Sequence, residues 1–116
     1  MQRDDEYIRE LLFEAENAKE AFLGIANSAL STDLDRKRYA HAVLLTDAGF
    51  FQQQSSGIFR LTNQGYDYLA SIKDDGIWQK TKEAAKSIGG VSLPVLMDIA
   101  IAYGKKELSQ RFNLSF

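Results

Sequence analysis

The sequence predicts a mainly helical fold with a small β-hairpin near its middle. Three observations support this prediction: apolar residues at helical spacing over residues 4–16, a helix, a hairpin and a helix in that order over residues 41–65, and two further helical patterns after residue 74. The order over residues 41–65 is that of the second half of a winged helix-turn-helix. We therefore expect one winged-helix-like domain, with its core in residues 1–73 and a C-terminal helical extension in residues 74–116.

The first helix is predicted by apolar residues that recur every three or four positions. Asp4, Asp5 and Glu6 stand at its start, where acidic side chains suit the N-terminal end of the helix dipole. The expected inward-facing residues are Tyr7, Ile8, Leu11, Leu12 and Ala15. Residues 17–31 keep part of this spacing but are interrupted by Gly24, so we expect a short helix or an irregular turn there.

A second helix is expected from about residue 33 to Ala48. Thr32 or Asp33 can cap it, and Thr32 followed by Asp35 resembles a capping box. Gly49 suits a left-handed C-cap. The predicted buried stripe of this helix consists of Ala42, Leu44, Leu45 and Ala48.

A hairpin and a third helix follow directly. Residues 50–54 and 58–61 are short apolar and aromatic runs, and the Ser-Ser-Gly segment between them suits a turn. Thr62 can cap the next helix, and Gly65 in its first turn permits close packing. The expected inward-facing residues of this helix are Tyr66, Leu69, Ala70 and Ile72.

Two more helices are expected in the C-terminal part. The first covers about residues 77–88, and its apolar face is expected to consist of Ile77, Thr81, Ala84, Ala85 and Ile88. Ser92 can cap the last helix, with Pro94 in the first turn, where a missing N–H costs little. The expected apolar side of this helix consists of Leu96, Ile99, Ala100 and Tyr103.

Composition narrows the class of protein. A chain of 116 residues, 45% of them hydrophobic, can bury one core. It contains no cysteine, which excludes disulfides and thiolate metal sites and favours a reducing, cytoplasmic location. The charged N-terminus does not resemble a signal peptide, and the longest apolar-rich segment, residues 91–103, is too short and too interrupted to span a membrane. We expect a cytoplasmic protein with no membrane partner.

The net charge of −2 means that DNA binding would need a local basic patch. The strongest such signal lies at the start of the second helix, at Arg36, Lys37, Arg38 and His41. In a helix-turn-helix the N-terminal part of the recognition helix enters the major groove. The hairpin adds neutral hydrogen-bonding groups at Gln53, Gln54 and Ser55. These seven residues are our predicted contacts with double-stranded DNA, and a regulatory function would follow.

No pattern in the chain predicts catalysis. His41 is the only histidine and stands beside Ala42 and Leu45, a position more typical of packing or partner contact than of proton transfer. The adjacent carboxylates at residues 4–5 and 74–75 are typical of helix caps. The sequence contains no glycine-rich phosphate loop, HExxH helix or calcium loop. We expect a non-enzymatic protein with no catalytic residues, no metal site and no cofactor.

Four groups of residues carry a family resemblance: Met1, Arg3-Asp4, Ile8-Arg9, Leu11-Leu12 and Glu14; His41, Leu44-Leu45 and Asp47-Ala48-Gly49; Arg60-Leu61-Thr62, Gly65 and Leu69; and Asp74-Asp75, Ile77-Trp78 and Lys80-Thr81-Lys82-Glu83. Together they resemble the small bacterial and phage proteins called domain of unknown function 2513. The resemblance covers nearly the whole chain and is weakest at residues 17–38 and past Gly90. It implies a winged-helix-like fold and association with phage or mobile elements, and it brings no established activity or catalytic residues.

The alternative is a protein-interaction module. Aromatic clusters are common interface anchors, and the candidates are Trp78, Tyr103, Phe112 and Phe116. For a phage-like protein, the partner would be a host defence complex or a host polymerase. The C-terminal helices would also serve for pairing with a second copy of the chain.

Overall fold

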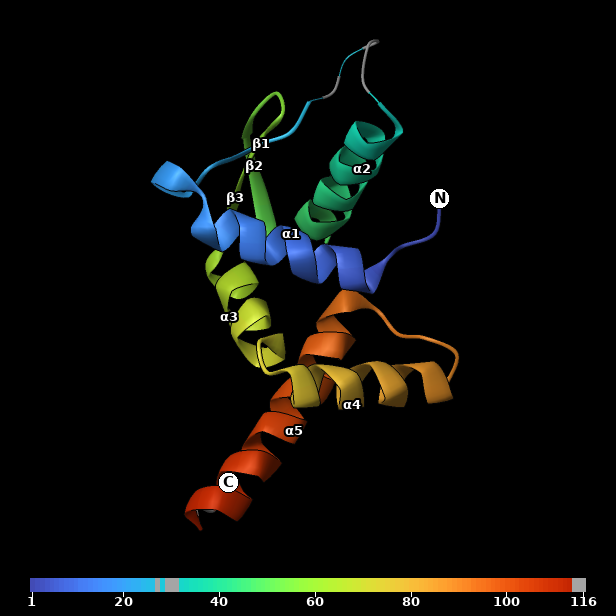
Figure 1. The fold of residues 1–116 in the computed structure, drawn as a ribbon, viewed down its shortest axis with the longest axis vertical. Coiled ribbons are helices and arrows are strands. Elements are labelled where there is room, and N and C mark those ends of the chain that lie inside the picture. Colours follow the sequence, from blue (N-terminus) through green and yellow to red (C-terminus); the bar gives the residue numbers. More distant parts are fainter. Residues whose placement is uncertain (27, 29–31, 114–116) are drawn as a thin grey trace. The chain divides into compact units, whose positions relative to one another are not determined.

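The computed structural model describes residues 1–26, 28 and 32–113. This part of the chain is mainly helical, with five α-helices and one three-stranded antiparallel sheet (Figure 1). It divides into two compact units, residues 1–69 and 70–116, which are described separately. That the chain behaves as one domain stays a prediction.

Helix α1 spans Asp5–Asn17 and confirms the first predicted helix. Asp4 is its N-cap: the side chain accepts a hydrogen bond from the backbone N–H of Tyr7 at 3.0 Å. Such a cap satisfies one of the backbone donors that a helix start leaves without an intrahelical partner. The buried stripe consists of Ile8, Leu11, Leu12 and Ala15, whereas Tyr7 is partly exposed.

The segment after α1 forms a short 3-10 turn, Lys19–Ala21, and then strand β1, Leu23–Gly24. The turn agrees with the expected short helix, but the strand was not predicted. A two-residue strand shows no alternation of apolar and polar residues, and its pairing with a distant strand cannot be read from spacing. Part of the same prediction falls on residues 27 and 29–31, which lie outside the described residues.

Helix α2 spans Asp33–Asp47 and begins with a complete capping box. Thr32 Oγ1 accepts the N–H of Asp35 at 3.1 Å, and the Asp35 carboxylate accepts the N–H of Thr32 at 3.2 Å. Gly49 follows the helix at φ 84°, which confirms the left-handed end. The fully buried residues are His41, Ala42 and Leu45, while Leu44 and Ala48 are only half-buried.

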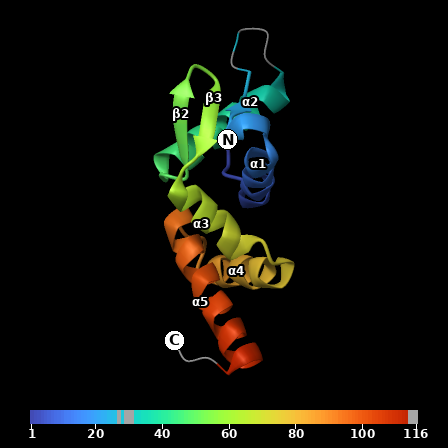
Figure 2. The same ribbon diagram turned by 90° about the vertical axis from the view of Figure 1, so that its left-hand side faces the viewer.

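Strands β2, Phe51–Ser55, and β3, Ile58–Leu61, form the predicted hairpin (Figure 2). The sheet order is β1-β3-β2, and Leu23 of β1 pairs with Phe59 of β3. Gly57 turns the hairpin at φ 72°, and its carbonyl accepts the N–H of Ile25 at 2.7 Å. Within β2 only the first residue, Phe51, is buried, so the rest of the strand projects into solvent.

Helix α3, Asn63–Ile72, starts at a close contact with Phe50, the residue that precedes β2. Thr62 donates its backbone N–H to the carbonyl of Phe50 at 3.1 Å, and Thr62 Oγ1 accepts the N–H of Gly65 at 3.0 Å. A Cβ added to Gly65 would collide with the Phe50 carbonyl oxygen and come within 2.9 Å of the Leu61 side chain. The expected close packing at Gly65 is therefore confirmed.

The predicted inward face of α3 was partly wrong. Tyr66 is 42% exposed and Ala70 is exposed, whereas Tyr68 is fully buried and stacks on Phe50 at 4.7 Å between ring centroids. Because Gly65 must face the Phe50 carbonyl, the buried positions are 65, 68, 69 and 72, and Tyr66, about 100° around the helix from Gly65, lies outside this face. Burial raises the pKa of the Tyr68 hydroxyl.

Residues 70–116 contain two packed helices, α4, Asp75–Ser87, and α5, Leu93–Phe112. Asp74 caps α4 by accepting the N–H of Ile77 at 2.9 Å, and Ser92 caps α5, as predicted. The fully or nearly fully buried residues are Trp78, Thr81 and Ala85 of α4 and Leu93, Leu96 and Ala100 of α5. No described helix is long and apolar enough to cross a membrane.

One detail of this helical pair differs from expectation. Ile88, placed on the apolar face of α4, is 71% exposed, because the helix ends at Ser87 and Ile88 leaves helical geometry at φ −112° and ψ 16°. Helix α5 continues without interruption through Gly104.

We predict that Gly65→Ala lowers the free energy of unfolding by about 1–3 kcal/mol, because the new methyl group overpacks against the Phe50 carbonyl. Urea denaturation followed by circular dichroism measures the change. Gly104→Ala is the matched control: nothing lies within 4 Å of its added Cβ, so it should stabilise the protein by about 0.5–1 kcal/mol. Equal effects of the two substitutions would contradict the packing role of Gly65.

Candidate nucleic-acid interface

The predicted basic cluster lies on the first turns of α2, and Arg36 is its most exposed member. The Arg36 side chain is 61% exposed and pairs with Asp33, one turn earlier, whose side chain is 97% exposed. Both groups stand in solvent on the same helix. An exposed pair of this kind contributes about 0.2–1 kcal/mol.

Lys37 reaches across to α1. Its Nζ lies 3.1 Å from a carboxylate oxygen of Asp4 and 4.4 Å from the centre of the Tyr7 ring. The other Asp4 carboxylate oxygen is the N-cap of α1. The Tyr7 N–H bond and the Lys37 ammonium together hold the pKa of Asp4 below its usual value.

Arg38 also binds α1, through a two-pronged contact with Glu14. Its Nη1 and Nη2 donate to the two carboxylate oxygens at 2.9 and 2.8 Å. This bidentate geometry is the strong form of an arginine–carboxylate pair. It lowers the pKa of the Glu14 carboxyl and raises that of the Arg38 guanidinium.

His41 completes the junction and is fully buried. Its Nε2 accepts the backbone N–H of Asp4 at 3.0 Å, and its Nδ1 lies 2.8 Å from the Lys37 carbonyl oxygen. Since Nε2 accepts, the ring proton belongs on Nδ1, which donates to that carbonyl. Tyr7 packs against the ring edge at 5.3 Å between centroids. His41 therefore fastens α1 to α2, and its ring is not at the surface.

The predicted cluster is thus divided between two tasks. Lys37, Arg38 and His41 join α2 to α1, whereas Arg36 points into solvent. The residues that sequence reasoning missed are the partners, Asp4 and Glu14. The acidic composition of the first helix was a signal that carboxylates were present, but no spacing rule pairs residues that lie 24 or 33 positions apart.

The hairpin candidates are exposed, as a protruding strand requires. Gln53, Gln54 and Ser55 all lie on the exposed part of β2. The Gln54 side chain donates to Gln52 Oε1 at 3.1 Å, and Arg60 binds the same oxygen from β3. Arg60 also donates to the Leu61 carbonyl at 3.0 Å, so its guanidinium stays at the base of the hairpin.

Charge is distributed unequally between the two units. Residues 1–69 contain seven basic and eleven acidic side chains, whereas residues 70–116 contain seven basic and five acidic ones. The unit that carries the predicted DNA contacts is therefore acidic. The C-terminal unit is the basic one.

The residues predicted to bind a protein partner are in different environments. Trp78 is fully buried, Tyr103 is partly buried and Phe112 is 63% exposed. Phe116 lies outside the described residues. Of the described three, only Phe112 is available as a surface anchor.

Among the described residues, no group of three His, Asp or Glu side chains could hold a metal ion.

A family model described as "Hypothetical protein (DUF2513)" matches residues 2–92. The chain belongs to this family. The match covers α1, α2, the hairpin, α3 and α4, and it ends where α5 is capped at Ser92. No curated protein and no solved structure matches the chain. The DUF2513 description assigns no activity.

We predict that Glu14→Gln lowers the free energy of unfolding at pH 7 by about 0.5–1 kcal/mol, because Arg38 loses its charged partner. The pKa of Glu14 is lowered by folding, so its contribution is present above the unfolded value of about 4.3 and is lost as pH falls through the folded value. The variant should therefore lose less stability than the native protein between about pH 5 and pH 3.

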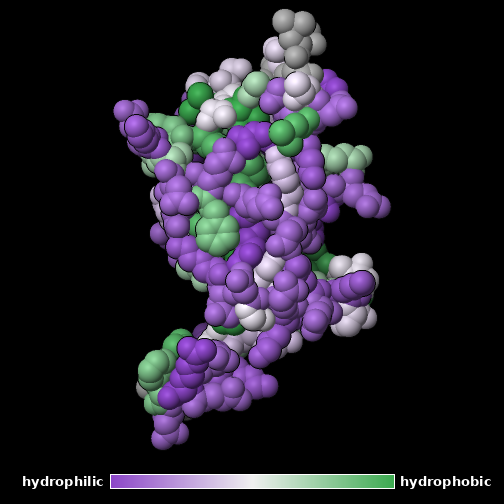
Figure 3. Space-filling model, in the orientation of Figure 1, coloured by the Kyte–Doolittle hydropathy of each residue, from purple (hydrophilic) through white to green (hydrophobic). Residues whose placement is uncertain are grey.

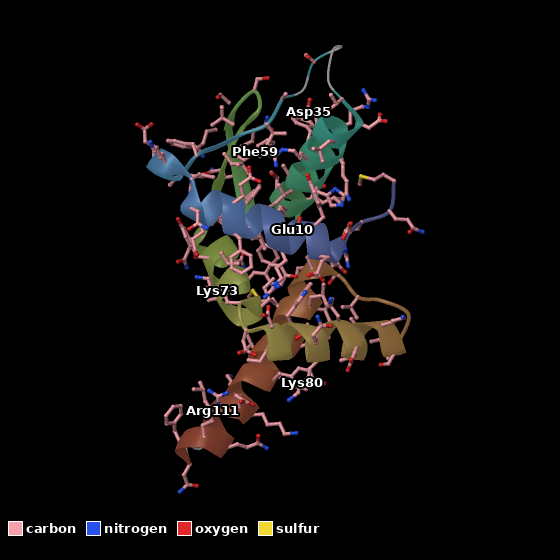
Figure 4. The ribbon with its side chains drawn as sticks, viewed as in Figure 1. Glu10, Asp35, Phe59, Lys73, Lys80 and Arg111 are labelled. Atoms are coloured by element: carbon pink, nitrogen blue, oxygen red, sulfur yellow. The ribbon has the colours of Figure 1, made fainter. Side chains whose placement is uncertain are left out.

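Glu10→Gln is the control for this experiment. Glu10 lies exposed on the same helix (Figure 4) and forms no ion pair with any described residue. Urea denaturation at several pH values distinguishes the two variants. Equal stability of both variants at pH 7 would show that the Glu14–Arg38 pair does not support the α1–α2 junction.

Proposed function

We propose that this protein is a non-enzymatic winged-helix regulator that binds double-stranded DNA. The observation that carries the proposal is the arrangement of α2 and the hairpin. Helix α2 is connected to β2 through Gly49, a single residue with left-handed backbone geometry. Strand β1 pairs with β3, which gives the sheet order β1-β3-β2. A helix followed by an exposed hairpin, with a third strand beside it, is the arrangement of a winged helix. The step from fold to DNA rests on analogy.

In this proposal the DNA contacts come from the solvent-exposed parts of residues 1–69. Arg36 would contact a phosphate or a guanine from the start of α2. Gln53, Gln54 and Ser55 would reach an adjacent groove or the backbone. Lys37 and Arg38 would first have to leave their carboxylate partners, so we assign them a supporting role together with His41.

The buried state of His41 supports the non-enzymatic part of the proposal. Both ring nitrogens already bind backbone groups of α1 and α2. A general base needs a lone pair within hydrogen-bond reach of the proton that it removes. The single histidine of this chain could act in that way only by breaking its contact with Asp4.

We predict measurable binding to a DNA duplex of about 20–30 base pairs at about 50 mM salt. The affinity should fall steeply toward about 200 mM salt, because the release of counterions from the phosphates then contributes less free energy. Replacing Arg36, Gln53 and Gln54 together by alanine should weaken binding at least about tenfold, because the loss of a single base contact worth about 1–3 kcal/mol is enough for that change. Fluorescence anisotropy measures both quantities.

Lys19→Ala is the charge control, since Lys19 is exposed on the 3-10 turn and belongs to neither α2 nor the hairpin. If the α2 and hairpin contacts dominate, this substitution should change the affinity for DNA less than threefold. A single phosphate contact contributes only a minor part of the total electrostatic binding energy. Absence of binding by the native protein at low salt would refute the DNA proposal.

A second candidate function is protein binding, which the exposed apolar residues of α5 favour. Leu108 is 43% exposed and Phe112 is 63% exposed, and Figure 3 shows a hydrophobic patch among hydrophilic atoms near the end of this helix. The partner would be a host defence complex, a host polymerase or a second copy of the chain. If so, Leu108→Ser with Phe112→Ser should abolish the complex and leave the helical content unchanged. If the native protein and the double variant capture a purified partner equally well, this surface is not the binding site.

A further inference from the structure

The face of α5 that packs on α4 changes character along the helix. Leu93, Leu96 and Ala100 are buried on it, and the next residues at the same three- or four-residue spacing are Tyr103, Glu107 and Gln110. The apolar contact between the two helices is thus followed by polar side chains. Where the contact ends, an open hollow of about 350 Å³ lies between them, lined by Lys80 of α4 and Tyr103, Lys106, Glu107 and Gln110 of α5.

A second hollow adjoins the first along the surface of α5. Its lining consists of Ala102, Lys105, Lys106, Ser109 and Gln110. Lys106 and Gln110 belong to both hollows. The two therefore form one continuous surface, which we call the α4–α5 groove. Figure 4 shows Lys80 extending from α4 on the side along which the second half of α5 runs.

The lysines of the groove differ from the basic residues of α2. Lys80, Lys105 and Lys106 form no ion pair with any described residue, whereas Arg36, Lys37 and Arg38 each pair with a carboxylate. The one acidic residue of the groove, Glu107, is bound by Arg111 at 2.9 Å. The groove therefore presents uncompensated positive charge, within the unit that carries the basic excess.

We propose that the α4–α5 groove binds the phosphodiester backbone of DNA. The inference rests on the proposed DNA-binding function and moves its main electrostatic contact from α2 to the C-terminal unit. Lysine ammonium groups are strong partners for phosphate, and Gln110, Ser109 and Tyr103 add neutral donors beside them.

The shape of the groove favours a chain of phosphates over a single anion. The groove is open and consists of two hollows that share Lys106, so successive negative groups can occupy it side by side. A duplex carries one phosphate charge for about every 1.7 Å of its axis. Because lysine is a point charge without the fixed geometry of arginine, these contacts would add affinity without reading sequence.

The test is duplex binding by the full-length protein with Lys80→Gln and Lys106→Gln combined. Both residues are exposed, so folding should be unaffected, and circular dichroism checks this. The double variant should bind at least about tenfold more weakly, and the slope of log affinity against log salt should fall by about 1–2, since two phosphate contacts are lost. The charge-matched control is Lys19→Gln with Lys86→Gln, two exposed lysines outside the groove.

Three results would overturn the inference, and they separate it from the proposed function. If the native protein binds DNA and the two double variants weaken binding equally, the groove is not the contact and the DNA function stands. If the native protein does not bind at about 50 mM salt, both fail. If polyglutamate of equal total charge displaces the duplex as well as unlabelled DNA does, the groove recognises acidic protein rather than phosphodiester.

Discussion

The α1–α2 junction at Asp4 is the contact on which the arrangement of the N-terminal unit depends. One carboxylate oxygen of Asp4 accepts the N–H of Tyr7, and the other accepts a hydrogen bond from the Lys37 ammonium. The backbone N–H of Asp4 donates to His41 Nε2. It therefore starts α1 and orients α2 at the same point. Since α2 leads directly into the hairpin through Gly49, the position of β2 and β3 follows from this junction as well. The buried imidazole of His41 suits this task because it accepts one backbone hydrogen bond and donates another.

The same junction changes the functional interpretation of the basic residues. Three successive cations at the start of a helix resemble a DNA-reading surface when only their order is known. In the structure, two of the three are held by carboxylates of α1, and the unit that contains them is acidic overall. Lys80, Lys105 and Lys106, which form no ion pair within the described residues, lie instead along α4 and α5. The basic residues in a sequence do not reveal how much positive charge the folded surface presents, because ion pairs with carboxylates neutralise part of that charge.

Local features of the fold could be predicted because the interactions that cause them span three or four residues. The caps at Asp4 and Ser92, the capping box of Thr32 and Asp35, and the left-handed end at Gly49 are all of this kind. Helical spacing gave the buried stripe of α1 for the same reason. Spacing failed for Tyr66, because the rotation of α3 is set by the contact of Gly65 with Phe50. Phe50 lies before the hairpin and outside the helix, so the periodicity of α3 does not reveal this contact.

The sequence by itself determined where helices and the hairpin form and which family the chain belongs to. The tertiary structure decided which side chains remain at the surface. Leu23 pairs with Phe59, Arg38 with Glu14 and His41 with the backbone of Asp4, and each of these contacts joins residues far apart in the chain. No periodicity encodes such pairs, since they exist only when separate elements pack. The candidate contacts that survive packing, Arg36 on α2 and Lys80 and Lys106 on the α4–α5 groove, could be selected only after that step.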